Sequence, residues 1–142
     1  MIVYVDTSFL IAAYVVDAHS PTVASRLGQK PHICLTPFSS SEAANAIYRQ
    51  VFIGRISMAE ARHAWRSFEN DSAMGVWKPV AFPNPAWEAC ADLALRYAPT
   101  LGVRTLDSLH VACALELQSE RFWTFDDRQA KLAEAVGLDT RA

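Results

Sequence analysis

The sequence predicts an α/β fold in which helices cover both faces of a parallel β-sheet. One observation is a series of short, continuously apolar segments with β-branched residues, typical of strands buried on both faces. The other is that segments with helix-capping signals separate these strands, an alternation typical of a parallel sheet. The 142 residues suffice for one domain with a sizeable core, and no linker or repeat divides residues 1–142.

Four apolar segments predict the strands, at residues 1–5, 32–36, 76–82 and 121–125. Pro79 lies within the third segment. Because proline cannot donate a backbone hydrogen bond, that strand is expected to be irregular or near a sheet edge. Residues 138–141 are expected to add a short last strand.

Capping residues and prolines at the starts, and glycines after several ends, delimit the helices. Ser57 and Glu60, for example, form the pattern of a capping box. The predicted helices cover residues 8–15, 21–28, 39–53, 57–70, 85–97, 105–118 and 126–136. The pair spanning 39–70 is expected to project from the body as a hairpin.

The composition excludes several classes of protein. A hydrophobic fraction of 51% argues against general disorder, and a net charge of −2 means that any nucleic-acid binding must use a local patch. No apolar run is long enough to span a membrane, and the N-terminus lacks the basic leader of a signal peptide. Cys34, Cys90 and Cys113 form no C-x-x-C pair, which favours buried, reduced thiols in a cytoplasmic protein.

Four acidic residues stand out by their positions. Asp6 follows the first predicted strand and Asp126 follows the fourth, whereas Glu42 and Asp107 lie near the starts of predicted helices. The carboxyl ends of parallel strands and the amino ends of the following helices meet at one edge of the sheet, where ligands of α/β proteins bind. We therefore expect the four carboxylates to converge.

Each acid also has a structural interpretation. Glu42 could close a capping box with Ser39, Asp107 could stabilise a helix dipole, and either Asp126 or Asp127 could cap the last helix. Asp6 is the hardest to explain structurally, because the apolar residues 2–5 run directly into it, apolar chain resumes after Thr7 and Ser8, and an unpaired buried charge is costly.

Four ionised carboxylates in one place repel one another, and a divalent cation removes that penalty. Oxygen ligands without clustered histidine or cysteine favour Mg²⁺ or Mn²⁺ over Zn²⁺. The chemistry that such a site predicts is metal-assisted phosphodiester hydrolysis, with one or two ions.

Four motifs spread over the chain resemble those of the PIN-domain family, and more closely its small VapC-type toxins: "VDTSFL", "SEAANAIYR", "TLDSLHVACAL" and "FWTFDDRQAKLAEAVGL". The resemblance implies a three-layer α/β/α sandwich with a mainly parallel, five-stranded sheet. It also implies an Mg²⁺- or Mn²⁺-dependent endoribonuclease that leaves a 5′-phosphate and a 3′-hydroxyl, acting as the toxin of a toxin–antitoxin pair.

Carried over by position, the family's acidic residues are Asp6, Glu42, Asp107 and Asp126, and its supporting polar residues are Ser8 and Thr124. The T-x-D form favours Asp126 over Asp127. Asp6 and Asp107 are expected to bind the metal most directly, while Glu42 and Asp126 act through water or orient the attacking water. His110, one turn after Asp107, is expected to be a packed, hydrogen-bonded residue.

The expected partners are RNA, an antitoxin and a second copy of the chain. The candidates for RNA-phosphate contacts are Arg49, Arg104 and Arg128, although each could be an ordinary solvated arginine. Apolar stripes on the 39–70 hairpin are explained by internal packing, but the resemblance implies an antitoxin groove there, together with homodimerisation.

Two other functions remain open. A phosphatase with an aspartate nucleophile also begins with a strand ending in aspartate, but it usually carries a second aspartate where this chain has Ser8. A non-catalytic RNA-binding or assembly module with the PIN fold would not need the complete set of acids.

Overall fold

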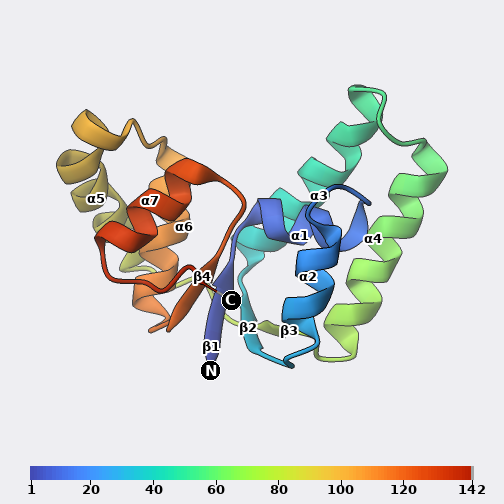
Figure 1. The fold of residues 1–142 in the computed structure, drawn as a ribbon, viewed down its shortest axis with the longest axis horizontal. Helices are drawn as coiled ribbons and strands as arrows, with labels where there is room; N and C mark the ends of the chain where they lie inside the picture. The colour runs from blue at the N-terminus through green and yellow to red at the C-terminus, as the bar shows by residue number, and fades with distance from the viewer. Residues whose placement is uncertain (142) are drawn as a thin grey trace.

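A computed structural model describes residues 1–141 and contains a four-stranded, fully parallel sheet (Figure 1). The strands are β1 (Ile2–Val5), β2 (His32–Leu35), β3 (Trp77–Pro79) and β4 (Arg121–Trp123), in the order β3-β2-β1-β4. The parallel α/β prediction is therefore confirmed, and β3 lies at an edge of the sheet, as Pro79 indicated.

The expectation of a fifth strand is wrong for the described residues. The segment after the last helix makes only one isolated parallel bridge, between Arg121 and Asp139, together with the backbone bond from Phe122 N to Asp139 O of 2.9 Å.

The helices form a layer on each face of the sheet, and Figure 1 shows them as two groups on either side of the strands. One group contains α1 (Thr7–Tyr14), α2 (Ser20–Leu27), α3 (Pro37–Phe52) and α4 (Met58–Ala73); the other contains α5 (Ala86–Leu101), α6 (Thr105–Glu116) and α7 (Asp127–Ala135). Side chains of β1 alternate between the two faces of the sheet. Tyr4 packs into the core beneath α5–α7, whereas Val3 and Val5 pack beneath α1–α4. The three-layer arrangement is confirmed.

Several helix boundaries differ from the prediction, and the start of α3 and the end of α5 show the cause. α3 begins at Pro37, because the hydroxyl of Thr36 accepts the Ser39 backbone N–H at 3.2 Å and caps the helix two residues early. α5 continues through Pro99 to Leu101 and ends at Gly102, whose φ of 64° is a left-handed cap. The capping box of Ser57 and Glu60 is present at the start of α4, with both bonds at 3.1 Å.

The three cysteines are buried and free, as expected. Within residues 1–141, none of the helices combines the length and the apolar composition that a bilayer crossing requires.

Candidate active site

Asp6 is a buried carboxylate held by three donors. It follows β1 and caps α1, with only 1% of its surface exposed. Oδ1 accepts the Phe9 N–H at 3.1 Å and the Ser8 hydroxyl at 2.6 Å, while Oδ2 accepts the Thr124 hydroxyl at 2.7 Å. Burial raises the pKa of Asp6 above its usual value, although these hydrogen bonds oppose the shift.

The two hydroxyls also tie Asp6 to the segment after β4. Ser8 Oγ accepts the Phe125 N–H at 2.9 Å, and Thr124 Oγ1 accepts the Asp126 N–H at 2.9 Å. Ser8 and Thr124 thus each bond both to Asp6 and to a backbone N–H after β4. They join the first strand to the start of α7, which lies more than a hundred residues later in the chain.

Glu42 projects from the second turn of α3. Its Oε1 accepts the Thr7 hydroxyl at 2.7 Å and a short hydrogen bond from His110 Nε2. The capping-box explanation of Glu42 is excluded, because Thr36 rather than Ser39 caps this helix. Burial raises the pKa of Glu42, but the hydrogen bond and charge of His110 and the Thr7 hydroxyl outweigh it, so the net pKa is lowered.

Asp107 and Asp126 combine a local structural bond with a place in the same cleft. Asp107, 8% exposed, accepts the Arg104 backbone N–H through Oδ2 at 2.9 Å, and Asp126 caps α7 by accepting the Gln129 N–H through Oδ1 at 3.0 Å. In each case the other carboxylate oxygen accepts no hydrogen bond from residues 1–141.

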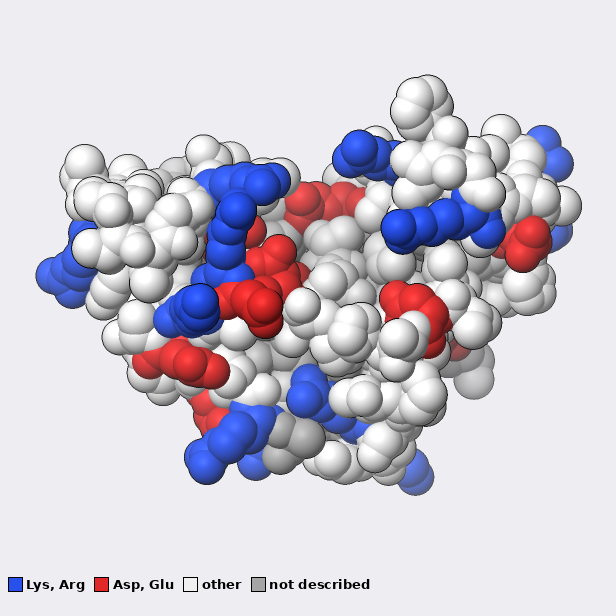
Figure 2. Space-filling model, turned by 45° about the horizontal axis from the view of Figure 1, so that its top comes forward, with Lys and Arg blue, Asp and Glu red and all other residues white. Residues whose placement is uncertain are grey.

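All four acids line one cleft of about 380 Å³, at the carboxyl edge of the sheet between the two groups of helices. Figure 2 shows acidic side chains gathered in this hollow and basic side chains on either side of it. The remaining lining residues are Thr7, Ser8, Arg104, Thr105, Leu106, His110 and Gln129. Asp127, by contrast, is exposed in the first turn of α7 and does not line the cleft.

The donor set fits a hard divalent ion held largely through water. Among residues 1–141, no three His, Cys, Asp or Glu side chains are close enough to form a ready-made metal cage. Mg²⁺ does not need such a cage, because it keeps several waters and usually binds one or two carboxylates directly. Free oxygens on Asp107 and Asp126, beside Asp6, provide ligands of that kind.

The sequence did not single out four polar residues of the cleft for the site: Thr7, Thr105, His110 and Gln129. Two of them, Thr7 and His110, bond directly to Glu42. Thr7 stands between Asp6 and Ser8, and that position was the only sequence signal for it. His110 is packed and hydrogen-bonded, as expected, but its partner is a site carboxylate rather than the core alone.

The three candidate arginines are exposed and differ in position. Arg104 precedes α6 and lines the cleft. Arg49 lies two turns beyond Glu42 on α3, and Arg128 lies in the first turn of α7; neither lines the cleft.

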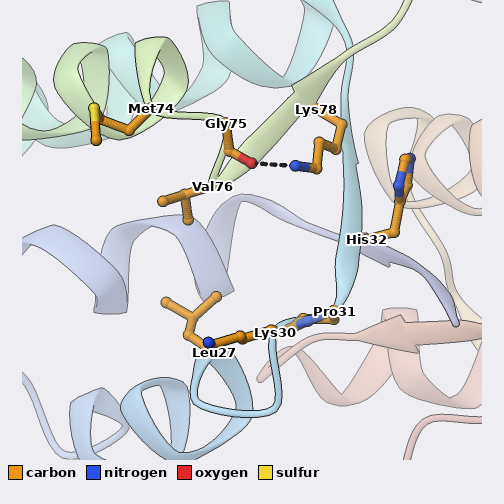
Figure 3. A pocket seen from close by; sticks show the side chains of 8 residues that line it. All are labelled: Leu27, Lys30, Pro31, His32, Met74, Gly75, Val76 and Lys78. Atoms are coloured by element: carbon orange, nitrogen blue, oxygen red, sulfur yellow. Dashed lines mark hydrogen bonds between the residues drawn. The ribbon is translucent and has the colours of Figure 1, made fainter.

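A second cavity lies at the opposite edge of the sheet, where β2 and β3 begin (Figure 3). Its polar lining is basic, with Lys30, His32 and Lys78, and the ammonium of Lys78 donates to the Gly75 carbonyl at 2.6 Å. No carboxylate lines this cavity, in contrast to the cleft that the four acids line.

Comparison with known proteins relates the whole chain to one fold. VapC20 from Mycobacterium tuberculosis, a sarcin-ricin loop cleaving toxin, is 18% identical with a TM-score of 0.70, over 96% of this chain and 95% of that chain. VapBC2 from Rickettsia felis, bound to a DNA fragment from their promoter, is 12% identical with a TM-score of 0.69, over 99% and 98%. FitAcB from Neisseria gonorrhoeae is 13% identical with a TM-score of 0.62, over 99% and 96%.

At these identities the likeness shows the fold, so the expected resemblance to the fold of VapC-type toxins is confirmed. No curated protein matches the chain by sequence. The family model of the PIN domain, however, matches residues 3–135. Since this match spans most of the sequence, the chain belongs to the PIN-domain family.

Proposed function

We propose that the chain is a metal-dependent endoribonuclease and the toxin of a toxin–antitoxin pair. The observation that carries the proposal is the convergence of four carboxylates, from four separate elements, on one cleft. Membership of the PIN-domain family and the fold shared with VapC20 support it.

In this mechanism Asp6 and Asp107 would hold Mg²⁺ or Mn²⁺ most directly, while Glu42 and Asp126 would act through water. When bound, the ion supplies a water of lowered pKa and positive charge beside the scissile phosphate. Ser8 and Thr124 keep Asp6 oriented, since both of its oxygens are hydrogen-bonded to them. Attack of water on phosphorus breaks the bond to the 3′ oxygen, which takes a proton and leaves a 3′-hydroxyl and a 5′-phosphate.

RNA must be held by local cations, because the net charge of the chain is −2 and the cleft is acidic. Arg104 is the first candidate, since it lines the cleft beside Asp107. Arg49 and Arg128 are placed to contact phosphates that lie further from the cleavage point.

The proposal includes a cognate antitoxin and a homodimer, acting in the cytoplasm where the RNA substrate is found. VapBC2 and FitAcB, which share this fold, support the antitoxin. Reading the adjacent open reading frame for a short DNA-binding protein, followed by co-expression and co-purification with this chain, tests this part.

The central experiment incubates the purified protein with RNA substrates and Mg²⁺ or Mn²⁺, with and without EDTA. The substrates include a sarcin-ricin loop hairpin, transfer RNA and messenger RNA. We expect cleavage that requires metal and falls by roughly 10²–10⁴-fold, the range typical of a catalytic side chain, in Asp6→Asn and Asp107→Asn. Asp127→Asn is the matched control, because its carboxylate is exposed outside the cleft, and it should cleave at the wild-type rate.

Two results would overturn the proposal. RNA binding without cleavage under any metal condition would favour a non-catalytic module. Hydrolysis of a phosphomonoester through a phosphorylated Asp6 would favour the phosphatase.

A further inference from the structure

We propose that His110 is a positioning residue: it hydrogen-bonds to one oxygen of Glu42 and leaves the other oxygen available to water or metal in the cleft. This inference rests on the proposed function, in which Glu42 takes part in the reaction. It assigns a role to a buried histidine that the four-acid mechanism does not use.

Three elements bring the relevant groups together. Tyr4 from β1 and His110 from α6 are 0% and 1% exposed, and the Tyr4 hydroxyl lies 2.7 Å from His110 Nδ1. The other ring nitrogen, Nε2, bonds to Glu42 Oε1 from α3. The hydrogen-bonded chain therefore runs from the buried sheet to the acidic cleft.

The chemistry of the partners assigns the hydrogens. The Glu42 carboxylate can only accept, so Nε2 carries the hydrogen of that bond. When the ring is neutral, Nδ1 carries no hydrogen and the Tyr4 hydroxyl donates to it; when the ring is protonated, Nδ1–H donates to the Tyr4 oxygen, and Nε2–H bonds to Glu42 in both forms. For the neutral ring, Tyr4 and Glu42 therefore favour the same tautomer, with the hydrogen on Nε2. The hydrogen bond at one ring nitrogen sets the state of the other.

Aromatic packing fixes the ring itself. The Phe38 ring lies 4.6 Å from the His110 ring, with 34° between their planes. Tyr4 is held in turn by a stacked contact with Phe122, at 5.4 Å and 10°. With both ends packed, the His110 Nε2–H has little freedom to point away from Glu42.

Glu42 receives both of its hydrogen bonds on the same oxygen. Oε1 accepts from His110 and from Thr7, whereas Oε2 accepts none from the described residues. The side chain is 21% exposed and lines the cleft, so Oε2 is the oxygen available to water or metal. Without His110, only the Thr7 bond would restrain rotation of the carboxylate.

The test uses the variants His110→Leu and His110→Gln. Val111→Ala is the control, because Val111 is a buried neighbour on α6 whose side chain cannot form a hydrogen bond to Glu42. Glutamine is chosen because its amide N–H can stand near the place of Nε2–H. Mn²⁺ affinity of the RNA-free protein is measured by electron paramagnetic resonance, and kcat and KM are measured with RNA. We expect His110→Leu to lower Mn²⁺ affinity or kcat by about 10–100-fold, the usual effect of losing a group that orients a ligand. His110→Gln should recover most of the loss, and Val111→Ala should show none.

A double-mutant cycle separates positioning from general stability. If His110 acts through Glu42, adding His110→Leu to Glu42→Gln causes no further loss of Mn²⁺ affinity or kcat. If the two losses multiply, His110 acts independently of Glu42 and the proposal is overturned. Equal behaviour of the leucine and glutamine variants also overturns it.

Nitrogen NMR of the metal-free wild type gives a readout that needs neither activity nor a mutant that folds. We expect the His110 ring to carry its slowly exchanging hydrogen on Nε2. Hydrogen on Nδ1 alone would overturn the proposal. If the wild type cleaves no RNA, the ribonuclease assignment fails, but the NMR and Mn²⁺ results still decide the role of His110.

Discussion

Replacing Thr124 by valine removes one hydroxyl from a buried hydrogen-bond network while keeping the shape of the side chain. The hydroxyl donates to Asp6 Oδ2 at 2.7 Å and accepts the Asp126 N–H at 2.9 Å. Because Asp6 is 1% exposed, water cannot readily replace the missing donor.

The magnitude follows from these two bonds. A hydrogen bond to a buried charge contributes about 1.5–3 kcal/mol, and one between neutral groups about 0.5–1.5 kcal/mol. Thr124→Val should therefore lower the free energy of unfolding by about 2–4.5 kcal/mol. For a chain of this length that corresponds to a fall in Tm of about 6–18 °C.

The assay is urea and thermal unfolding followed by circular dichroism at neutral pH in EDTA. Thr140→Val is the matched control, because it deletes a hydroxyl that donates to Glu134 at 2.8 Å on the exposed surface. Such a bond is worth little in water, so the control should change stability by less than about 0.5–1 kcal/mol.

The effect of Thr124→Val should also depend on pH. The Thr124 hydroxyl stabilises the ionised form of Asp6, whose pKa burial raises above 3.8. The destabilisation should therefore shrink as the pH falls through that pKa and Asp6 becomes protonated. A Thr124→Val variant no less stable than Thr140→Val would refute the reasoning.

Three further predictions concern groups elsewhere in the fold. Because burial raises the pKa of Asp6, its ionised form is less favourable in the folded state than in the unfolded state. The free energy of unfolding of Asp6→Asn relative to wild type should therefore rise between pH 3 and pH 7. Urea unfolding in EDTA measures this trend, and a falling trend contradicts it. Tyr14→Phe should cost about 1–3 kcal/mol of unfolding free energy, since the Tyr14 hydroxyl accepts the buried Trp77 indole N–H and donates to Asp71, both at 2.6 Å; a loss below about 0.5 kcal/mol counts against this network. Burial raises the pKa of Cys113 to about 12, so this thiol and the other two buried thiols should react with a thiol reagent only in urea, and rapid reaction of any thiol in the native protein contradicts the burial.

Local sequence signals predicted most of the fold because they act over a few residues. Apolar, β-branched segments located all four strands, and proline, glycine and capping residues located the helices. The errors are the fifth strand, which is a single bridge, and helix boundaries such as the start of α3, where a neighbouring residue competes. Thr36 and Ser39 are both good caps, and only the geometry of the turn after β2 selects Thr36.

The positions of the four acids also followed from the sequence, since the edge of a parallel sheet gathers whatever follows its strands. The sequence did not show which oxygen of each acid accepts a hydrogen bond. Glu42 meets His110 across 68 positions of sequence and Asp6 meets Thr124 across 118. Contacts at such separations depend on the packing of whole layers, which no local pattern encodes.

By itself, the sequence determined the order of strands and helices along the chain, the burial of the strands and the edge of the sheet at which Asp6, Glu42, Asp107 and Asp126 meet. Only the tertiary structure decided that the Thr124 hydroxyl donates to Asp6 Oδ2 and that His110 and Thr7 bond to the same oxygen of Glu42. The physical reason is that periodicity and capping are set by adjacent residues, whereas the direction of a side chain at a site is set by hydrogen bonds from distant ones.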